Sequence, residues 1–165
     1  MTAMKPGAKW TLGVLAAAML AAAFTVSTYR TIRAPVDAFE RSALNRLQAT
    51  GLIADIERTS VFFGDEPVLV AFGQTRDGRR TVTWATPTVT HAVYADEGVG
   101  EDDVRRAVAD RVPGARVIRV LPGIYQGEYV WEVYYRAERD GRERSFYDYY
   151  RFEDGRWLET IRLLD

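Results

Sequence analysis

The sequence predicts an α+β protein: an N-terminal transmembrane helix followed by two similar units, each made of one helix packed on an antiparallel sheet of three or four strands. The tetrapeptide Arg76–Arg79 (Arg-Asp-Gly-Arg) recurs as Arg139–Arg142, each time between two strand-like runs. Each copy also lies downstream of one amphipathic helix pattern. Because Asp-Gly between alternating residues is a strong hairpin signal, we expect a duplicated unit in which this turn fixes the strand register.

The N-terminal run from Thr11 to Thr28 contains no charged residue and is rich in alanine, leucine and valine. Its length is close to the minimum for spanning a bilayer, and basic residues lie outside both of its ends. We therefore predict a single membrane-spanning helix. A cleaved signal peptide ending at Ala21–Ala23 is the alternative, although the apolar run continues past that site. The predicted anchor residues are Trp10, Leu12, Leu15, Leu20, Phe24 and Tyr29.

Three segments are predicted along the chain. Residues 1–33 form a short cytoplasmic tail and the anchor, residues 34–97 the first unit, and residues 98–165 the second. The arginines after the span outnumber the lysines before it, which taken alone favours the opposite orientation. A long C-terminal domain translocates largely regardless of charge, so we expect both units on the extracytoplasmic side of the cell membrane.

The first unit is predicted to begin with a helix at Ala34–Pro35, because proline is favoured at the first helical position. Apolar residues at three-to-four spacing extend this helix from Pro35 to Thr50, and Gly51 ends it. Strand-like runs follow at residues 52–63, 67–75, 80–86 and 88–95.

The second unit repeats this order. Acidic residues at 101–103 open a helix, where the helix dipole favours them, and Pro113–Gly114 ends it. Strand-like runs follow at residues 115–125, 129–139, 143–152 and 156–163. Because a unit of this size has a marginal core when isolated, we expect the two units to pack on each other.

Composition limits the chemistry that the chain can carry out. Its 165 residues include no cysteine and one histidine, and the formal net charge is −1. The absence of cysteine excludes disulfides, thiolate metal sites and a cysteine nucleophile. Positive and negative charges nearly balance, so the surface lacks the basic field that attracts polyanions, and we expect no nucleic-acid partner.

The single histidine, His91, alternates with valines in a strand-like run and is interpreted as structural. One histidine cannot build a multi-histidine zinc site, and no nucleophile-elbow motif is present. The acidic residues at 96–97 and 101–103 are interpreted as a solvated turn and a helix start, with weak calcium binding as the alternative. Gly98–Gly100 lacks the third glycine of a dinucleotide motif and is interpreted as a linker. We predict no catalytic residue, metal site or cofactor.

Aromatic residues crowd the second unit on both sides of its Asp-Gly turn. Period-two alternation divides them between two faces of a sheet, of which one must be core. We predict that the other face is an exposed tyrosine–arginine surface, a composition enriched at protein interfaces. Cross-strand aromatic pairing that stiffens the sheet and carbohydrate stacking are the alternatives. The interface candidates are Tyr134, Arg136, Tyr147, Tyr149 and Arg151.

The stretches Val130–Tyr135 (Val-Trp-Glu-Val-Tyr-Tyr) and Tyr149–Gly155 (Tyr-Tyr-Arg-Phe-Glu-Asp-Gly) resemble the YpmB or TseB-like proteins of Gram-positive bacteria. The layout of the whole chain is similar to theirs. These proteins are cell-wall elongation regulators with an N-terminal membrane anchor and two cystatin-like, PepSY-related subdomains. The resemblance implies a non-catalytic, externally facing membrane protein that associates with an elongation-class penicillin-binding protein.

The expected function is therefore regulation of cell-wall elongation by binding a penicillin-binding protein, without enzymatic activity. A PepSY- or cystatin-like protease inhibitor or chaperone-like binding module, anchored or secreted, is the alternative. A third class, a glycan hydrolase, rests only on scattered carboxylates and the aromatic surface.

Overall fold

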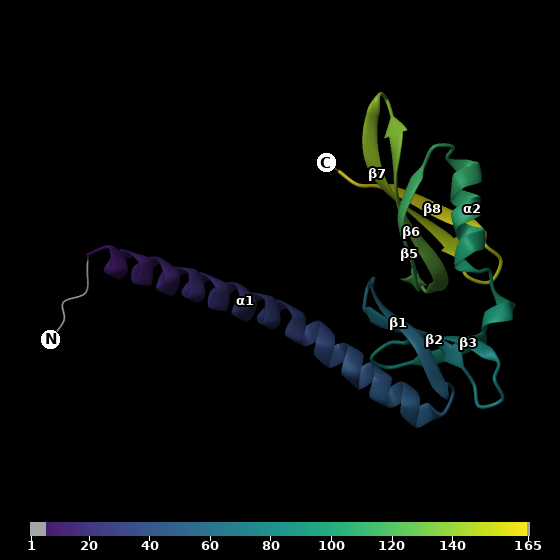
Figure 1. The fold of residues 1–165 in the computed structure, drawn as a ribbon. Helices are drawn as coiled ribbons and strands as arrows, with labels where there is room; N and C mark the ends of the chain where they lie inside the picture. The colour runs from purple at the N-terminus through teal and green to yellow at the C-terminus, as the bar shows by residue number, and fades with distance from the viewer. Residues whose placement is uncertain (1–5, 165) are drawn as a thin grey trace. The chain divides into compact units, whose positions relative to one another are not determined.

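The protein is represented by a computed structural model that describes residues 6–164, with side chains from residue 19 onward except at positions 26 and 32. The chain divides into two compact units, Met1–Arg41 and Ser42–Asp165. The first is helical from Pro6, and the second contains the end of that helix and all of the strands (Figure 1).

Helix α1 runs without a break from Pro6 to Thr50 and includes Pro35. The predicted helix start at Ala34–Pro35 is therefore wrong. A proline inside a helix removes one backbone donor, here the partner of the Thr31 carbonyl, and α1 continues on both sides of it. The prediction treated proline as a start signal, whereas the chain tolerates it as an interior residue.

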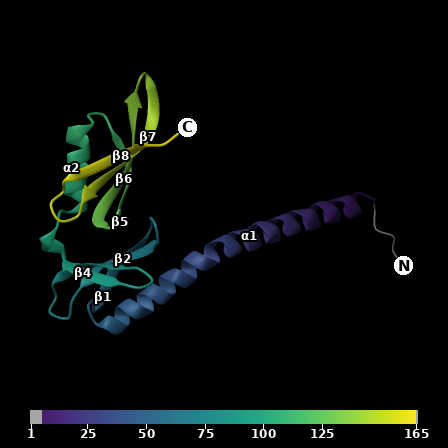
Figure 2. The same ribbon diagram turned by 180° about the vertical axis from the view of Figure 1, so that it is seen from behind.

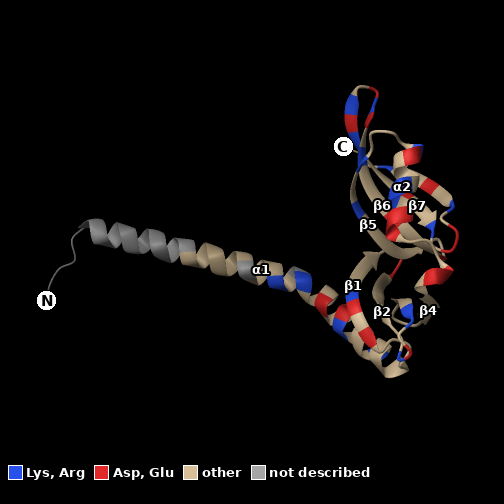
Figure 3. Ribbon diagram, turned by 45° about the vertical axis from the view of Figure 1, so that its right-hand side comes forward, with Lys and Arg blue, Asp and Glu red and all other residues tan. Residues whose placement is uncertain are grey.

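The predicted anchor lies in α1. Among the described residues, no helix combines the length and hydropathy that a membrane crossing requires. Trp10, Leu12 and Leu15 fall outside the residues whose side chains are described. Leu20, Phe24 and Tyr29 are exposed. From residue 19, where its side chains are first described, α1 carries no charge before Arg30, and charged residues then recur along the helix (Figure 3).

The unit Ser42–Asp165 contains two antiparallel four-stranded sheets, in the orders β1-β2-β3-β4 and β5-β6-β7-β8. This confirms the predicted α+β class and is consistent with two similar units (Figures 1 and 2). The strands of the first sheet are β1 (Asp55–Phe63), β2 (Pro67–Gln74), β3 (Arg80–Ala85) and β4 (Thr90–Tyr94). The short helix η1 (Ala95–Glu97) and α2 (Glu101–Arg111) follow, and then β5 (Arg116–Tyr125), β6 (Glu128–Arg139), β7 (Arg142–Arg151) and β8 (Trp157–Arg162).

The two sheets share one hydrophobic core. On the first sheet, Leu47 of α1 packs with Ile53 and Ala71 on one face. The other face contributes to a larger cluster that also contains α2 and the second sheet. The two sheets therefore pack on each other, as the marginal size of each predicted helix-and-sheet unit implies. The cluster includes Phe62, Val68, Val70, Val82, Trp84, Val104, Val108, Trp131, Tyr135, Tyr150 and Phe152.

The repeated tetrapeptide makes two different turns. In the second copy Asp140 and Gly141 both have positive φ, 55° and 70°, and Arg139 pairs directly with Arg142. This is a two-residue hairpin turn of the type that Asp-Gly favours. In the first copy the outermost pair is Gln74 with Arg80, so the loop is longer. The tetrapeptide lies at the turn of both hairpins, as predicted, but the two loops differ in length because pairing stops at Gln74 and Arg80 in the first copy.

Candidate functional site

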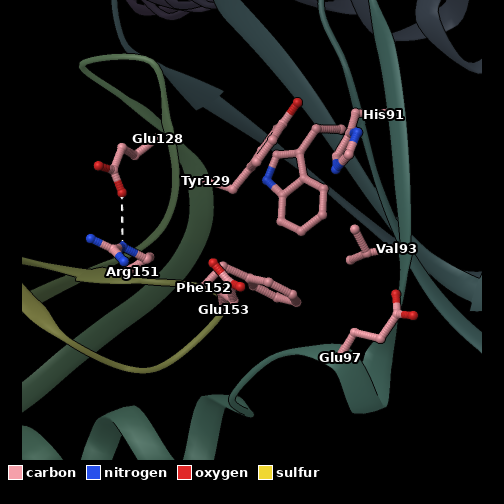
Figure 4. A pocket seen from close by; sticks show the side chains of 9 residues that line it. His91, Val93, Glu97, Glu128, Tyr129, Arg151, Phe152 and Glu153 are labelled. Atoms are coloured by element: carbon pink, nitrogen blue, oxygen red, sulfur yellow. Dashed lines mark hydrogen bonds and ion pairs between the residues drawn. The ribbon is translucent and has the colours of Figure 1, made fainter.

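A cleft of about 420 Å³ opens beside the shared core, between β4 of the first sheet and the adjoining ends of β6 and β7 (Figure 4). We call it the aromatic cleft. The first sheet and η1 contribute one wall, and the β5–β6 turn region and the end of β7 contribute the other. Its lining residues are Trp84, His91, Val93, Glu97, Glu128, Tyr129, Arg151, Phe152 and Glu153.

Stacked rings form the apolar part of the cleft. The ring of His91 lies nearly parallel to that of Tyr129, with centroids 4.4 Å apart and an interplanar angle of 12°. Trp84 contacts Tyr129 at 4.9 Å and meets Phe152 edge-on at 4.8 Å. The single histidine, interpreted from sequence as structural, thus packs on an aromatic neighbour and also lines a cavity (Figure 4).

The polar part of the cleft is acidic. Its one guanidinium, that of Arg151, is already engaged, since Nε donates to the Glu128 carboxylate at 2.9 Å and Nη1 to Asp154 at 3.4 Å. Glu97 accepts a hydrogen bond from the Tyr94 backbone N–H at 3.0 Å. Within the described part of the chain, the exposed Glu153 makes no hydrogen bond or ion pair. Carboxylates therefore outnumber cations around the aromatic rings.

The predicted tyrosine–arginine surface divides into an accessible part and a buried part. Tyr134 and Tyr147 are half-buried cross-strand neighbours with ring centroids 5.1 Å apart. Tyr134 shares a hydrogen bond with Ser145, which together with Arg136 lowers the pKa of its phenol. Arg136 pairs with Glu143 at 3.3 Å. We call Tyr134, Arg136 and Tyr147 the tyrosine patch; Arg151 lies instead in the aromatic cleft.

Tyr149 does not belong to an exposed surface, so this part of the prediction is wrong. Only 6% of Tyr149 is accessible. Its ring stacks on Tyr125 of β5, with centroids 3.9 Å apart, and its hydroxyl donates to Glu132 at 3.0 Å. Burial and the negative charge of Glu132 raise the pKa of Tyr149. The prediction considered β6 and β7 alone, whereas β5 supplies the ring that covers Tyr149.

Comparison with known proteins places this architecture among solved folds. No protein-family model matches the chain, and no curated protein matches it. The solved structure of the YpmB protein from Bacillus subtilis matches it with a TM-score of 0.66 and 21% sequence identity, covering 74% of this chain and 96% of that one. The chain has a YpmB-like fold. At this identity the similarity concerns the fold alone.

Within this YpmB-like fold, a buried acid forms a hydrogen-bond network that was not predicted from the sequence. Asp148 of β7 is fully buried. It accepts hydrogen bonds from Arg111, from the Tyr135 hydroxyl at 3.2 Å and from the Thr160 hydroxyl at 2.7 Å. A signal was present, because alternation places Asp148 on the same face as Phe146, Tyr150 and Phe152, and an acid on a core face requires partners. The network ties the end of α2 to the sheet of the YpmB-like fold.

The acidic residues at the start of α2 behave as interpreted from sequence. The Asp103 carboxylate accepts the Gly100 backbone N–H at 2.9 Å, which caps the helix. Glu101 pairs with Arg105 at 2.7 Å and with Arg58 at 3.3 Å. These contacts satisfy the start of α2, as expected for acidic residues at a helix N-terminus.

Proposed function

We propose that this chain is a non-catalytic, membrane-anchored extracytoplasmic protein that binds an elongation-class penicillin-binding protein and regulates cell-wall elongation. The observation that carries the proposal is the YpmB-like fold, which extends over 96% of the YpmB chain. The family resemblance of the strand sequences supplies the role and the partner class.

Partner contact is assigned to the second sheet and the adjoining cleft. The tyrosine patch presents aromatic and guanidinium groups, which interfaces favour because they bury large areas at low entropic cost. The aromatic cleft offers a concave counterpart for a side chain from the partner. Binding at either place needs no reacting group from this chain.

The anchor is assigned to the uncharged run Thr11–Thr28. Basic residues on both sides of this run hold such a segment in place, and a short N-terminal tail then lies in the cytoplasm. The two sheets would lie outside the cell membrane, where cell-wall synthases work. Deleting residues 1–33 should release the protein from the membrane fraction, and mass spectrometry of the mature N-terminus separates an anchor from a peptide cleaved after Ala23.

Crosslinking in intact cells of the native host, followed by capture of the tagged chain, tests the partner. The expected result is recovery of a transpeptidase of the elongation class. A matched variant, Tyr134→Ala with Tyr147→Ala, should recover less of it. Capture of cytosolic proteins alone would rule out the proposal.

A protease inhibitor or chaperone-like module is the second candidate, and one observation favours it. Strand β4 lies at an edge of its sheet beside the aromatic cleft, an arrangement that can hold an extended segment of another protein. Recovery of a secreted protease in the same capture, with loss of its activity in the presence of the chain, would support this candidate over the first.

A further inference from the structure

The aromatic cleft has the chemistry of a site for a cation. Aromatic faces attract positive charge through their quadrupoles, and Tyr129 supplies a partly exposed ring here. His91 stacks on this ring, and the buried Trp84 supports it from behind. A cavity of about 420 Å³ falls within the size range of ligand sites.

The charges around these rings favour a cation over a neutral group. The lining contains three glutamates and one arginine, and this arginine is held by Glu128 and Asp154. Glu153 has no partner within the described residues, and Glu97 accepts only a backbone N–H. Elsewhere on this chain Glu101 and Asp148 are paired with arginine, whereas exposed acids such as Asp110 are not. The carboxylates of Glu97 and Glu153 are therefore available to a cationic ligand beside the rings.

The edge of the first sheet borders the same cleft. Strand β4 pairs with β3 and ends the sheet order. The Tyr94 N–H turns away from β3 to reach Glu97. Because alternate residues of an antiparallel strand direct their backbone groups to the same side, Ala92 and Thr90 also present theirs at the free edge. The side chains of His91 and Val93 line the cleft (Figure 4).

A strand added to this edge would place every second side chain on the cleft side of the sheet. Main-chain hydrogen bonds supply affinity in this mode of recognition, and pockets for alternate side chains supply specificity. Building on the protein-binding role proposed above, we propose that the partner contributes an extended segment that pairs with β4 and inserts a lysine or arginine side chain into the aromatic cleft. Glu153 and Glu97 pair with its charge, and the rings of His91 and Tyr129 contact its stem.

Binding of a synthetic peptide to the full chain in detergent micelles tests this directly. The probe is a short capped peptide of alternating threonine and valine with lysine at its centre, and the control peptide carries norleucine instead. Titration is followed by NMR chemical shifts and tryptophan fluorescence. We expect the lysine peptide to bind about tenfold more tightly, because norleucine keeps the contacts of the stem but lacks the charge that pairs with Glu97 and Glu153.

Two matched changes separate the parts of the proposal. Glu97→Gln with Glu153→Gln should lower the affinity for the lysine peptide to that of the norleucine peptide, whereas Asp110→Asn, an exposed acid on α2, should leave it unchanged. A lysine peptide methylated on alternate backbone nitrogens should lose its binding, because it cannot pair with β4. This last test changes no residue of the protein.

Several results would overturn the assignment. Equal binding of the lysine and norleucine peptides would show that the cleft does not recognise a cation. Full binding of the methylated peptide would show that the segment does not pair with β4. If no peptide binds, or if chitin oligomers bind at the same rings, both the cation recognition and the strand pairing are rejected. In the cellular capture, equal recovery of a synthase by the parent and by the double glutamate variant would reject this site and still support the proposed function.

Discussion

Arg111, at the end of α2, donates a hydrogen bond to the fully buried carboxylate of Asp148 in β7. The hydrogen bonds to Asp148 and Tyr150 raise the pKa of Arg111 against the opposing effect of burial, so the guanidinium stays charged. Removing one partner of such a pair leaves the other charge buried without compensation, which is the costly event. The contact also joins a helix end to a central strand.

We therefore predict that Arg111→Ala lowers the free energy of unfolding by about 3 kcal/mol, the lower end of the range for a buried pair, since the Arg111 side chain is 33% exposed. Urea denaturation measures this. Arg106→Ala, which breaks the exposed pair with Asp103 on the same helix, should cost about 0–1 kcal/mol. Equal losses in the two variants would contradict a special role for the buried pair.

Tyr135 makes the stability of the fold sensitive to alkaline pH. Burial, with the charge of Asp148, raises its pKa from 10.0 to about 12. The folded state thus favours the neutral phenol, and this contribution to stability is complete below pH 10 and is lost as the pH rises toward about 12. Tyr135→Phe should remove part of this loss, as seen by urea denaturation at both ends of the window.

Tyr134→Phe is the control for this experiment. The hydrogen bonds of Tyr134 with Ser145 and Arg136 lower its pKa, so its titration cannot contribute to a loss of this sign. The pH profile of this variant should still show the alkaline loss. If Tyr135→Phe follows the parent profile throughout, another group must titrate there.

Most of the secondary structure could be predicted because its signals are local. Each predicted strand overlaps an observed one, and α2 starts at Glu101 where the acidic residues begin. The proline and Asp-Gly signals were less reliable, because the extent of a helix or of strand pairing also depends on residues further away. Pro35 lies inside a helix, and the two Arg-Asp-Gly-Arg copies close loops of different length because pairing extends further in the second hairpin.

The candidate site could not be predicted, because it depends on strands that are distant in sequence. His91 and Tyr129 come from different sheets, and nothing local indicates that their rings stack. The burial of Tyr149 depends in the same way on Tyr125. Outside this site, the buried network could have been predicted, because the place of Asp148 on an apolar face required a partner such as Arg111.

Tyr147 and Tyr149 lie two residues apart in β7, but replacing each with alanine should have different effects. Tyr149→Ala removes a buried ring and leaves Glu132 without its phenol donor, so we expect a loss of about 3–5 kcal/mol. Tyr147→Ala removes a half-buried ring and should cost clearly less, while reducing capture of the partner. Thermal unfolding together with the crosslinking capture distinguishes the two. If Tyr147→Ala loses capture only under conditions in which the protein also unfolds, the tyrosine patch contributes to stability and not to partner binding.

The close approach of the two sheets at Gly123 and Phe62 provides a final test. A Cβ built on Gly123 of β5 would lie 2.4 Å from the Phe62 ring of β1, so no side chain fits there without movement. Gly123→Ala should therefore destabilise the protein by about 1–3 kcal/mol through overpacking.

A double-mutant cycle with Phe62→Ala identifies the cause. Alanine lacks the Cγ and Cδ atoms that lie 2.4–2.7 Å from the Cβ built on Gly123. The loss caused by Gly123→Ala should therefore shrink by about 0.5–3 kcal/mol in the Phe62→Ala background. Urea denaturation of the four proteins gives this coupling energy. Additive losses would mean that the two sheets do not meet at these residues, and the shared core on which the aromatic cleft depends would need another arrangement.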